Sequence, residues 1–331
     1  MLARKASAIL IALAITMWAV LFAWTAPSSI RAQASRIQQT LGGSAPSHNT
    51  PPRADATRTL PAPVRFREET GRGLLVRAWV NGAGPYTFAL DTGAGGTIIS
   101  ERVAAEAKVG IVSGRSVPIS GLSGAGGGTG SEGVIRDIAL GERSNRLPGR
   151  DTVLVTASLP PDLDGVLDPS ENYYPLGYTI DLPASTLTAF DPRVAPLRIN
   201  DTPVGGTVVR WLTEGGNRRP FVQLDNGRRA LLDTGSNFGL AVQESAARSF
   251  GVGPDEGRTR AGVRDLGRGR VAARRIAPTT VQIGALVLRR IPTDLLYGAA
   301  TDAPVIIGRD ALRPFQLTFD PVNRLIRIAP R

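Results

Sequence analysis

The sequence predicts an all-β fold built from two similar lobes, on three observations. The 331 residues include 38 glycines and 25 prolines but only 5% aromatic residues, which indicates many turns and short strands rather than long helices. The chain is long enough for two domains, each with its own core. The tripeptide Asp-Thr-Gly occurs twice, at 91–93 and 233–235, each time after an apolar segment. Each copy therefore marks the end of a predicted strand and the start of a turn.

The first 34 residues are typical of an export segment. Arg4 and Lys5 precede an uncharged, mostly apolar run at 6–26, and Ala32-Gln33-Ala34 offers a small-x-small cleavage site. The run is long enough to span a bilayer, so this signal peptide is either cleaved or kept as an N-terminal membrane anchor. Positive charge on its N-terminal side leaves the rest of the chain outside the cytoplasm. We therefore expect a periplasmic or extracellular protein, free or tethered to the inner membrane through residues 6–26.

Residues 35–66 are rich in Ser, Thr, Pro, Ala and Gln, which predicts a flexible linker. The same segment could instead be a propeptide that covers the functional site, and the sequence leaves both readings open. Beyond it we expect an N-terminal lobe at 67–200 and a C-terminal lobe at 201–331. The expected assembly state is a monomer.

The first lobe opens with a hairpin signal. Two apolar segments, 74–80 and 86–90, flank the turn-forming residues 81–85. After the first Asp-Thr-Gly, residues 97–99 predict another short strand. A helix is expected over 100–108, because its first residue is a serine suited to capping.

The second half repeats this order. A second hairpin signal consists of residues 221–224, the turn 225–227 and residues 229–232. The second Asp-Thr-Gly follows, then the apolar segment 238–242 and a helix-like segment at 243–250.

Later landmarks keep the same spacing. Gly121 and Gly262 lie in glycine-rich stretches at nearly equal distances after the two Asp-Thr-Gly copies. Further on, Val166-Leu167-Asp168 takes the place that Ile306-Ile307-Gly308 takes in the second half. Such matched spacing indicates an internal repeat of about 140 residues, which predicts two similar lobes that face each other.

Composition excludes several kinds of chemistry. The chain has no cysteine, which rules out disulfides, thiol nucleophiles and thiolate metal sites. Its one histidine, His48, cannot supply a multi-histidine zinc site and lies in a Pro/Ser-rich stretch ill-suited to a Ser-His-Asp triad. The acidic group Asp162, Asp164 and Asp168 lacks the spacing and glycine of a calcium loop, so no metal site is expected. Carboxylates remain as the main candidates for hydrolytic chemistry.

The net charge of +11 comes mostly from arginines that are scattered along the chain. No dense basic tract interleaved with aromatic residues occurs, so the pattern predicts a solvated basic surface and no nucleic-acid partner.

Two Asp-Thr-Gly turns in one repeat point to two carboxyls that meet. Carboxylates held about 3 Å apart cannot both ionise cheaply, so they share a proton. The ionised member can take a proton from a water molecule while the protonated member donates to a peptide carbonyl oxygen. The candidate catalytic residues are therefore Asp91 and Asp233.

The neighbouring residues of each turn suit a close approach. The hydroxyls of Thr92 and Thr234 can hydrogen-bond across the lobe junction and lock the turns together. The glycines, Gly93 and Gly235, permit the two backbones to come near.

These motifs resemble those of aspartic proteases. The resemblance is carried by Phe88-Ala-Leu-Asp-Thr-Gly-Ala94, by Leu231-Leu-Asp-Thr-Gly-Ser236 and by Val305-Ile-Ile-Gly-Arg-Asp310, and it covers about residues 72–330. The apolar-apolar-Gly element and the glycine-rich stretches look retroviral-type (retropepsin-like), while the two-lobed single chain looks like a smaller pepsin. The combination is most similar to exported bacterial retropepsin-like proteins with two fused lobes.

The resemblance implies a bilobed acid-protease fold, with two β-barrel-like lobes, short helices and a cleft between them. It implies Asp91 and Asp233 as the catalytic pair, a protein or peptide substrate, and no metal or organic cofactor. It also implies that the glycine-rich stretches are flaps that close over the substrate. The flap residues are Gly121, Leu122, Ser123, Gly124, Gly262 and Val263.

Two features depart from the family pattern. Asp168 stands where the first lobe should have a glycine after two apolar residues. A buried aspartate is costly unless it is hydrogen-bonded, so we expect a different local backbone or a more open loop there. No tyrosine occurs at 113–130, where a pepsin-like flap would carry one.

Three functions remain open from the sequence. The first is an aspartic endopeptidase. The second is a non-catalytic module on the same scaffold that binds a peptide or a cell-wall polymer, which Asp168 and the basic surface motivate. The third is hydrolysis of a non-peptide amide or ester by the same pair. Two intact Asp-Thr-Gly copies favour the endopeptidase, because a non-catalytic descendant need not keep both.

Overall fold

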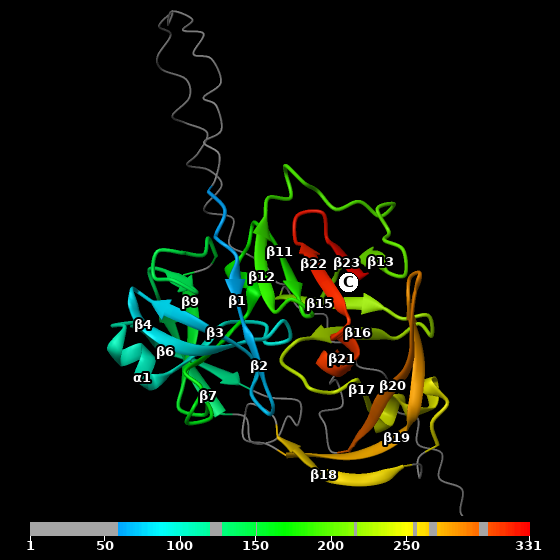
Figure 1. Ribbon diagram of the computed structural model, residues 1–331. Helices are drawn as coiled ribbons and strands as arrows, with labels where there is room; N and C mark the ends of the chain where they lie inside the picture. The colour runs from blue at the N-terminus through cyan, green and yellow to red at the C-terminus, as the bar shows by residue number, and fades with distance from the viewer. Residues whose placement is uncertain are drawn as a thin grey trace, which may run out of the picture. The chain divides into compact units, whose positions relative to one another are not determined.

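The computed structural model confirms an all-β fold with two lobes and only short helices (Figure 1). In Figure 1 the strands of the first lobe run from blue to green and those of the second from yellow-green to orange-red. The structure describes residues 59–119, 128–149, 151–214, 217–253, 257–264, 270–297 and 304–331.

In the described part of the chain, the first lobe is a nine-stranded sheet. Its strands follow the order β2-β3-β4-β10-β5-β9-β7-β6, and β8 pairs with Ala78–Val80 of β3, beyond the part of β3 that pairs with β2. The predicted hairpin is β3 and β4, and their turn contains Asn81 and Gly82 at positive φ. The strands are β2 (Arg67–Glu69), β3 (Gly73–Val80), β4 (Ala83–Leu90), β5 (Ile98–Ser100), β6 (Gly110–Ile119), β7 (Gly128–Val134), β8 (Ile138–Leu140), β9 (Thr152–Thr156) and β10 (Gly165–Leu167).

The second lobe repeats this arrangement in an eight-stranded sheet, counted over the same described residues. The order β14-β15-β16-β21-β17-β20-β19-β18 matches the first lobe strand for strand. In both lobes the strand before the Asp-Thr-Gly turn has a parallel neighbour, β10 beside β4 and β21 beside β16. The strands are β14 (Leu212–Glu214), β15 (Asn217–Gln223), β16 (Arg229–Asp233), β17 (Leu240–Gln243), β18 (Arg258–Arg264), β19 (Arg270–Ile283), β20 (Leu286–Tyr297) and β21 (Val305–Gly308).

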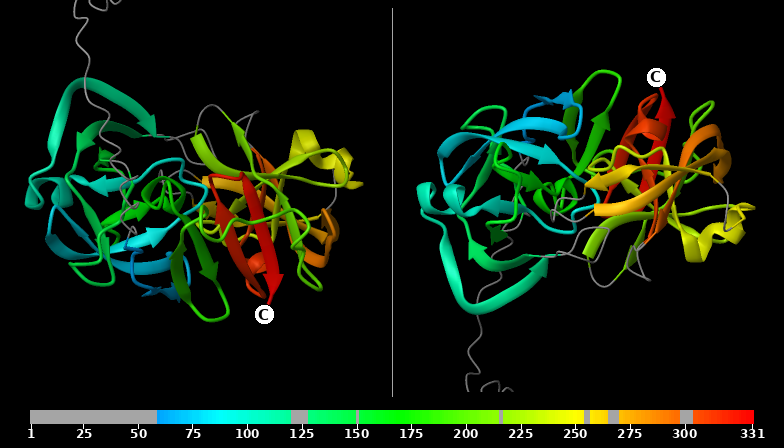
Figure 2. Two further views of the ribbon diagram at one scale, coloured as in Figure 1. Left: turned by 90° about the horizontal axis from the view of Figure 1, so that it is seen from above. Right: turned by 90° about the horizontal axis from the view of Figure 1, so that it is seen from below.

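A third sheet joins the two halves of the chain. Its central pairing is antiparallel, between β11 and β22, with Ile180 opposite Leu317. Both views in Figure 2 show the green strands β11 and β12 beside the red strands β22 and β23. In the order β1-β12-β11-β22-β23-β13, these strands are β1 (Val64–Arg65), β12 (Thr186–Phe190), β11 (Gly177–Asp181), β22 (Phe315–Asp320), β23 (Leu325–Pro330) and β13 (Thr207–Arg210).

The helices are short, and each follows the end of a strand. The predicted helix after the first turn is α1 (Glu101–Glu106), and the side chain of Ser100 caps it by accepting from the backbone N–H of Val103. The second predicted helix is a 3-10 helix, η1 (Glu244–Phe250). Two further helices, α2 (Pro169–Asn172) and α3 (Arg309–Leu312), begin directly after β10 and β21.

The expected linker ends earlier than residue 66. β1 pairs with β12, and Val64 and Phe66 are both buried. Alternating apolar residues at the end of an otherwise polar segment explain this strand. The proposed membrane tether lies outside the described residues, and no helix within them has the length and apolar character that crossing a bilayer requires.

Aromatic side chains anchor the sheet that joins the two halves. The rings of Tyr178 on β11 and Phe319 on β22 stack with centroids 4.7 Å apart, and both side chains are buried. Trp211 packs edge-on against Phe319 at 5.8 Å. Burial of these rings therefore couples the two halves of the chain.

Replacing Phe319 with alanine should lower the free energy of unfolding by about 3–5 kcal/mol, because it empties a fully buried site between the halves. Urea denaturation measures this loss. The control, Val322→Ala, changes a side chain that is 49% exposed and should shift stability by no more than about 0.5 kcal/mol. Similar losses in the two variants would contradict the coupling.

Candidate active site

The two Asp-Thr-Gly turns are held in place by the parallel strand pairs. Asp91 follows the last residue of β4, and its backbone N–H donates to the carbonyl of Leu167 at the end of β10, at 3.0 Å. Asp233 is the last residue of β16 and lies opposite Gly308 at the end of β21. Each aspartate therefore emerges where two parallel strands end together, which fixes its backbone.

Reciprocal hydrogen bonds lock the turns to each other. The backbone N–H of Thr92 donates to Thr234 Oγ1, and that of Thr234 donates to Thr92 Oγ1, both at 3.1 Å. The hydroxyl of Thr92 donates to the carbonyl of Leu232 at 2.6 Å, and that of Thr234 to the carbonyl of Leu90 at 3.2 Å. Both threonines are completely buried, so this interlock is shielded from water.

The glycines bring each turn against the carboxyl of the other. A methyl group on Gly93 would lie 2.8 Å from the carboxyl carbon of Asp233, and one on Gly235 would collide with that of Asp91. Only glycine leaves room for this approach. The aspartates are 6% and 9% exposed, so the two carboxyls face each other in a nearly dry environment.

Burial and mutual repulsion perturb both carboxyls. Burial raises the pKa of Asp91 well above its usual range, and the charge of Asp233 and the hydrogen bond between the two carboxyls raise it further. Burial also raises the pKa of Asp233, but the hydrogen bond from Asp91 lowers it in part. Burial and mutual repulsion therefore favour one proton shared between the two groups.

The surroundings of Asp233 stabilise its ionised form. Its Oδ1 accepts from the backbone N–H of Gly235 at 2.8 Å and of Ser236 at 3.1 Å, and the charge of Arg309 lowers its pKa. Asp91 Oδ1 accepts one such bond, from Gly93 at 2.7 Å. The extra donor and the nearby cation therefore favour the ionised form of Asp233 over that of Asp91.

Arg309 supports this side of the site from the core of the second lobe. Its side chain is 3% exposed, and Nη1 donates to the carbonyl of Thr234 at 2.5 Å. Glu68 on β2 of the first lobe lies 3.5 Å from its Nε. The sequence contained a signal for this residue, because Arg309 directly follows the apolar-apolar-Gly element, but its role depends on contacts across the two lobes.

Arg219 on β15 is a second residue that sequence reasoning missed. Its guanidinium packs against Gly95, in the loop that follows the first turn, and its buried Nε has no hydrogen-bond partner among the described residues. No local pattern marks it, because it reaches the turn from the other lobe.

Asp168 is completely buried at the end of β10, so the expected opening of this loop is wrong. Its backbone does differ from that of Gly308, with ψ at 106° rather than −173°. Both residues are N-caps, of α2 and α3, but only Asp168 has a side chain that caps: its Oδ1 accepts from the backbone N–H of Ser170 at 2.8 Å. A hydrogen bond therefore replaces part of the lost hydration.

The predicted flaps fall on equivalent hairpins. The connection between β6 and β7 contains Gly121, Leu122, Ser123 and Gly124, which lie outside the described residues. Gly262 and Val263 belong to β18, where Val263 pairs with Val271 of β19. The hairpins β6–β7 and β18–β19 hold the same position in the two strand orders.

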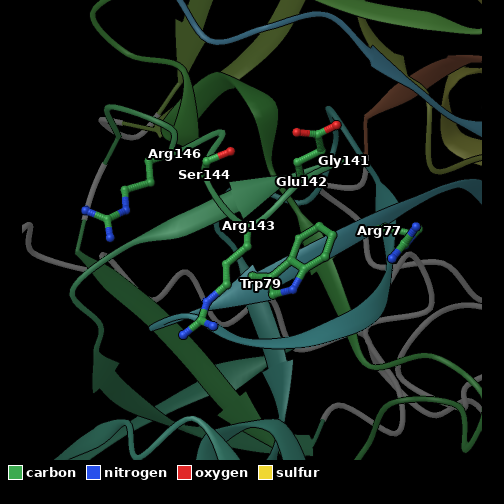
Figure 3. Close-up of a pocket in the computed structure, with 7 residues that line it drawn as sticks. All are labelled: Arg77, Trp79, Gly141, Glu142, Arg143, Ser144 and Arg146. Atoms are coloured by element: carbon green, nitrogen blue, oxygen red, sulfur yellow. The ribbon is translucent and has the colours of Figure 1, made fainter.

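A surface concavity of about 610 Å³ lies on the first lobe and includes no residue of the two turns (Figure 3). Arg77 stacks over the indole of Trp79 at 5.3 Å. In Figure 3 the guanidinium groups of Arg77, Arg143 and Arg146 point in different directions. They do not converge on one point as an anion site requires, so the paired turns remain the candidate site. The concavity is lined by Arg77, Trp79, Gly141, Glu142, Arg143, Ser144 and Arg146.

Thr92→Val should destabilise the fold by about 1–3 kcal/mol, because it leaves the buried N–H of Thr234 and the carbonyl of Leu232 without partners. Urea denaturation measures the change. Thr92→Ser keeps the hydroxyl and should lose less. A Thr92→Val variant as stable as the wild type would contradict a stabilising interlock, because valine keeps the methyl group and lacks only the hydroxyl.

A comparison with protein families finds a similarity within the first lobe. Residues 76–167 match a family model described as aspartyl protease. The matched segment runs from β3 to β10 and includes the first Asp-Thr-Gly turn. The comparison with curated proteins found no match. The family match supports an aspartic protease family and a protease-type function for this chain.

Proposed function

We propose that the protein is an aspartic endopeptidase with Asp91 and Asp233 as its catalytic dyad. The observation that carries the proposal is the interlock of two Asp-Thr-Gly turns, which presents two buried carboxyls to each other. Such a pair shares one proton, as a hydrolytic acid–base site requires. The retropepsin-like character and the fusion of two lobes, at 67–200 and 201–331, belong to the same proposal.

The dyad supplies both proton transfers of peptide hydrolysis. Ionised Asp233 takes a proton from a water molecule between the carboxyls, and protonated Asp91 donates its proton to the oxygen of the peptide carbonyl. The water oxygen bonds to the carbonyl carbon and gives a tetrahedral diol. Asp233 then gives its proton to the amide nitrogen, the carbon–nitrogen bond breaks, and Asp91 recovers a proton from the diol. One water molecule is consumed, and the dyad returns to its starting state.

The expected substrate is a protein or peptide outside the cytoplasm. Residues 1–34 would direct export, and residues 6–26 would tether the protein if the segment is not cleaved. N-terminal sequencing of the exported protein distinguishes these states, since a cut after Ala34 leaves a free monomer. A chain found intact in the cytoplasm would contradict the proposed localisation.

Asp91→Asn and Asp233→Asn should each reduce peptide cleavage by about 10²- to 10⁴-fold or more, because either change leaves the dyad without a proton donor or acceptor. Cleavage profiling with a diverse peptide library, at acidic to neutral pH, measures this. A statine-type transition-state mimic should inhibit the wild type.

The matched control is Asp162→Asn, which removes a half-exposed carboxyl from the first lobe and should leave cleavage unchanged. Absence of cleavage by the purified wild type across the library would refute the endopeptidase. Peptide binding without cleavage, unaffected by Asp91→Asn, would instead identify the non-catalytic binding module.

A further inference from the structure

Asp168 lies beside the dyad in a position where the other lobe has no side chain. Leu167, the residue before Asp168, is in register with Leu90, the residue before Asp91. In the second lobe Gly308 is in register with Asp233, so Gly308 holds the place that Asp168 holds in the first lobe. The chain therefore places a third carboxyl next to Asp91 and none at the matching place next to Asp233. The side chain of Asp168 is 0% exposed.

One carboxyl oxygen of Asp168 has a hydrogen-bond partner, and the other has none among the described residues. Oδ1 accepts from Ser170, whereas Oδ2 is buried and has no partner within the described residues. Two hydrogen bonds fix the backbone of Asp168. Its N–H donates to Thr97 Oγ1 at 3.2 Å, and its carbonyl accepts from Asn172 Nδ2 at 2.9 Å. A capping role would need only Oδ1, so the cap does not account for the second oxygen.

The carboxyl of Asp168 is buried near one acidic group, Glu171. Burial raises the pKa of Asp168 to about 7, and the charge of Glu171 on α2 raises it as well, while hydrogen bonds from Ser170 and Glu171 oppose the shift. Arg218 of β15 binds Glu171 at 2.6 Å and partly offsets that charge. The titratable and charged groups that face Asp168 or its partner are Asp91 from the first turn, Glu171 from α2, Tyr178 from β11 and Arg218 from β15.

The charge of Asp168 acts on the dyad from one side only. It raises the pKa of Asp91, whereas Arg309 lowers the pKa of Asp233. Both influences favour the same arrangement, with the proton on Asp91 and the negative charge on Asp233. The two lobes thus polarise the dyad with charges of opposite sign.

We propose that Asp168 is a positioning residue of the dyad, whose ionised carboxyl keeps the proton on Asp91 and extends peptide cleavage to the alkaline side of neutral pH. The inference rests on the proposed endopeptidase function and adds the control of its pH range. Asp168 touches neither substrate nor water in the reaction and acts only through Asp91.

The direction of the effect follows from the order of protonation. Below about pH 7 Asp168 is neutral and leaves the dyad unaffected, so the acid limb of the activity profile does not depend on it. Above about pH 7 its charge opposes the loss of the remaining proton from Asp91. Loss of that proton sets the alkaline limb, so removing the charge should move this limb alone.

The test compares kcat/KM for one cleaved peptide across pH in the wild type, Asp168→Asn and Asp168→Ser. Both replacements keep an oxygen that can accept from Ser170 and cap α2, but neither carries a charge. Both should shift the alkaline limb to lower pH by about half a unit or more, with the acid limb unchanged. The matched control is Asp310→Asn, which removes an exposed carboxyl from α3, the helix that follows Gly308 in the second lobe, and should shift neither limb.

Folding stability gives a readout that needs no activity. Because the pKa of Asp168 is raised in the folded state, its contribution to stability is complete below the unfolded pKa of about 4 and is lost as pH rises through about 7. The wild type should therefore lose more stability between pH 5 and pH 8 than either Asp168 variant.

Each outcome supports or overturns the inference. Active variants with an unmoved alkaline limb would overturn it and leave the endopeptidase intact. Absence of cleavage by the wild type would overturn both. If both variants are unfolded at pH 5, where the wild-type carboxyl is neutral, the role of Asp168 is structural and the inference fails.

Discussion

The structure depends on holding the carboxyls of Asp91 and Asp233 together at a buried site, where both cannot be ionised at once. Thr92 and Thr234 make this possible, because their reciprocal hydrogen bonds are buried. Moving either turn would break both of these hydrogen bonds at once. Each strand that carries a turn also ends beside a parallel partner. The repulsion between the carboxyls is therefore opposed by the interlock and by both sheets, and it is relieved by one retained proton.

The two lobes contribute to this pair unequally, although their strand orders match. The second lobe offers Asp233 two backbone donors and the charge of Arg309, all of which favour a carboxylate. The first lobe gives Asp91 one backbone donor and a buried acid, Asp168, as a neighbour. Two similar halves can favour one carboxyl of a shared pair as the protonated member only if the halves differ in this way.

Much of the fold could be predicted from the sequence because its signals are local. The Asn81-Gly82 turn, the Ser100 cap and the apolar segments before each turn all act within a few residues, and the structure contains a hairpin or helix at each. The repeated spacing extended these local signals to two lobes. The pairing of β11 with β22 gave no such signal, since it joins residues far apart in the chain.

The candidate site was predictable in its residues but not in its electrostatics. Two Asp-Thr-Gly copies identified Asp91 and Asp233, and the structure brings them together. The contributions of Arg309 and Arg219 arise from packing between the lobes, which no local pattern encodes. Asp168 was conspicuous as a departure, yet its burial and its use as a helix cap depend on the three-dimensional path of α2.

A titration of the aspartate carboxyl carbons by ¹³C NMR tests most directly whether the dyad shares one proton. Asp91 and Asp233 should titrate together in two widely separated steps, and replacing either with asparagine should abolish the coupling in the other. Two independent transitions, each near the ordinary aspartate pKa of about 4, would contradict a shared proton and with it the acid–base chemistry proposed for this protein.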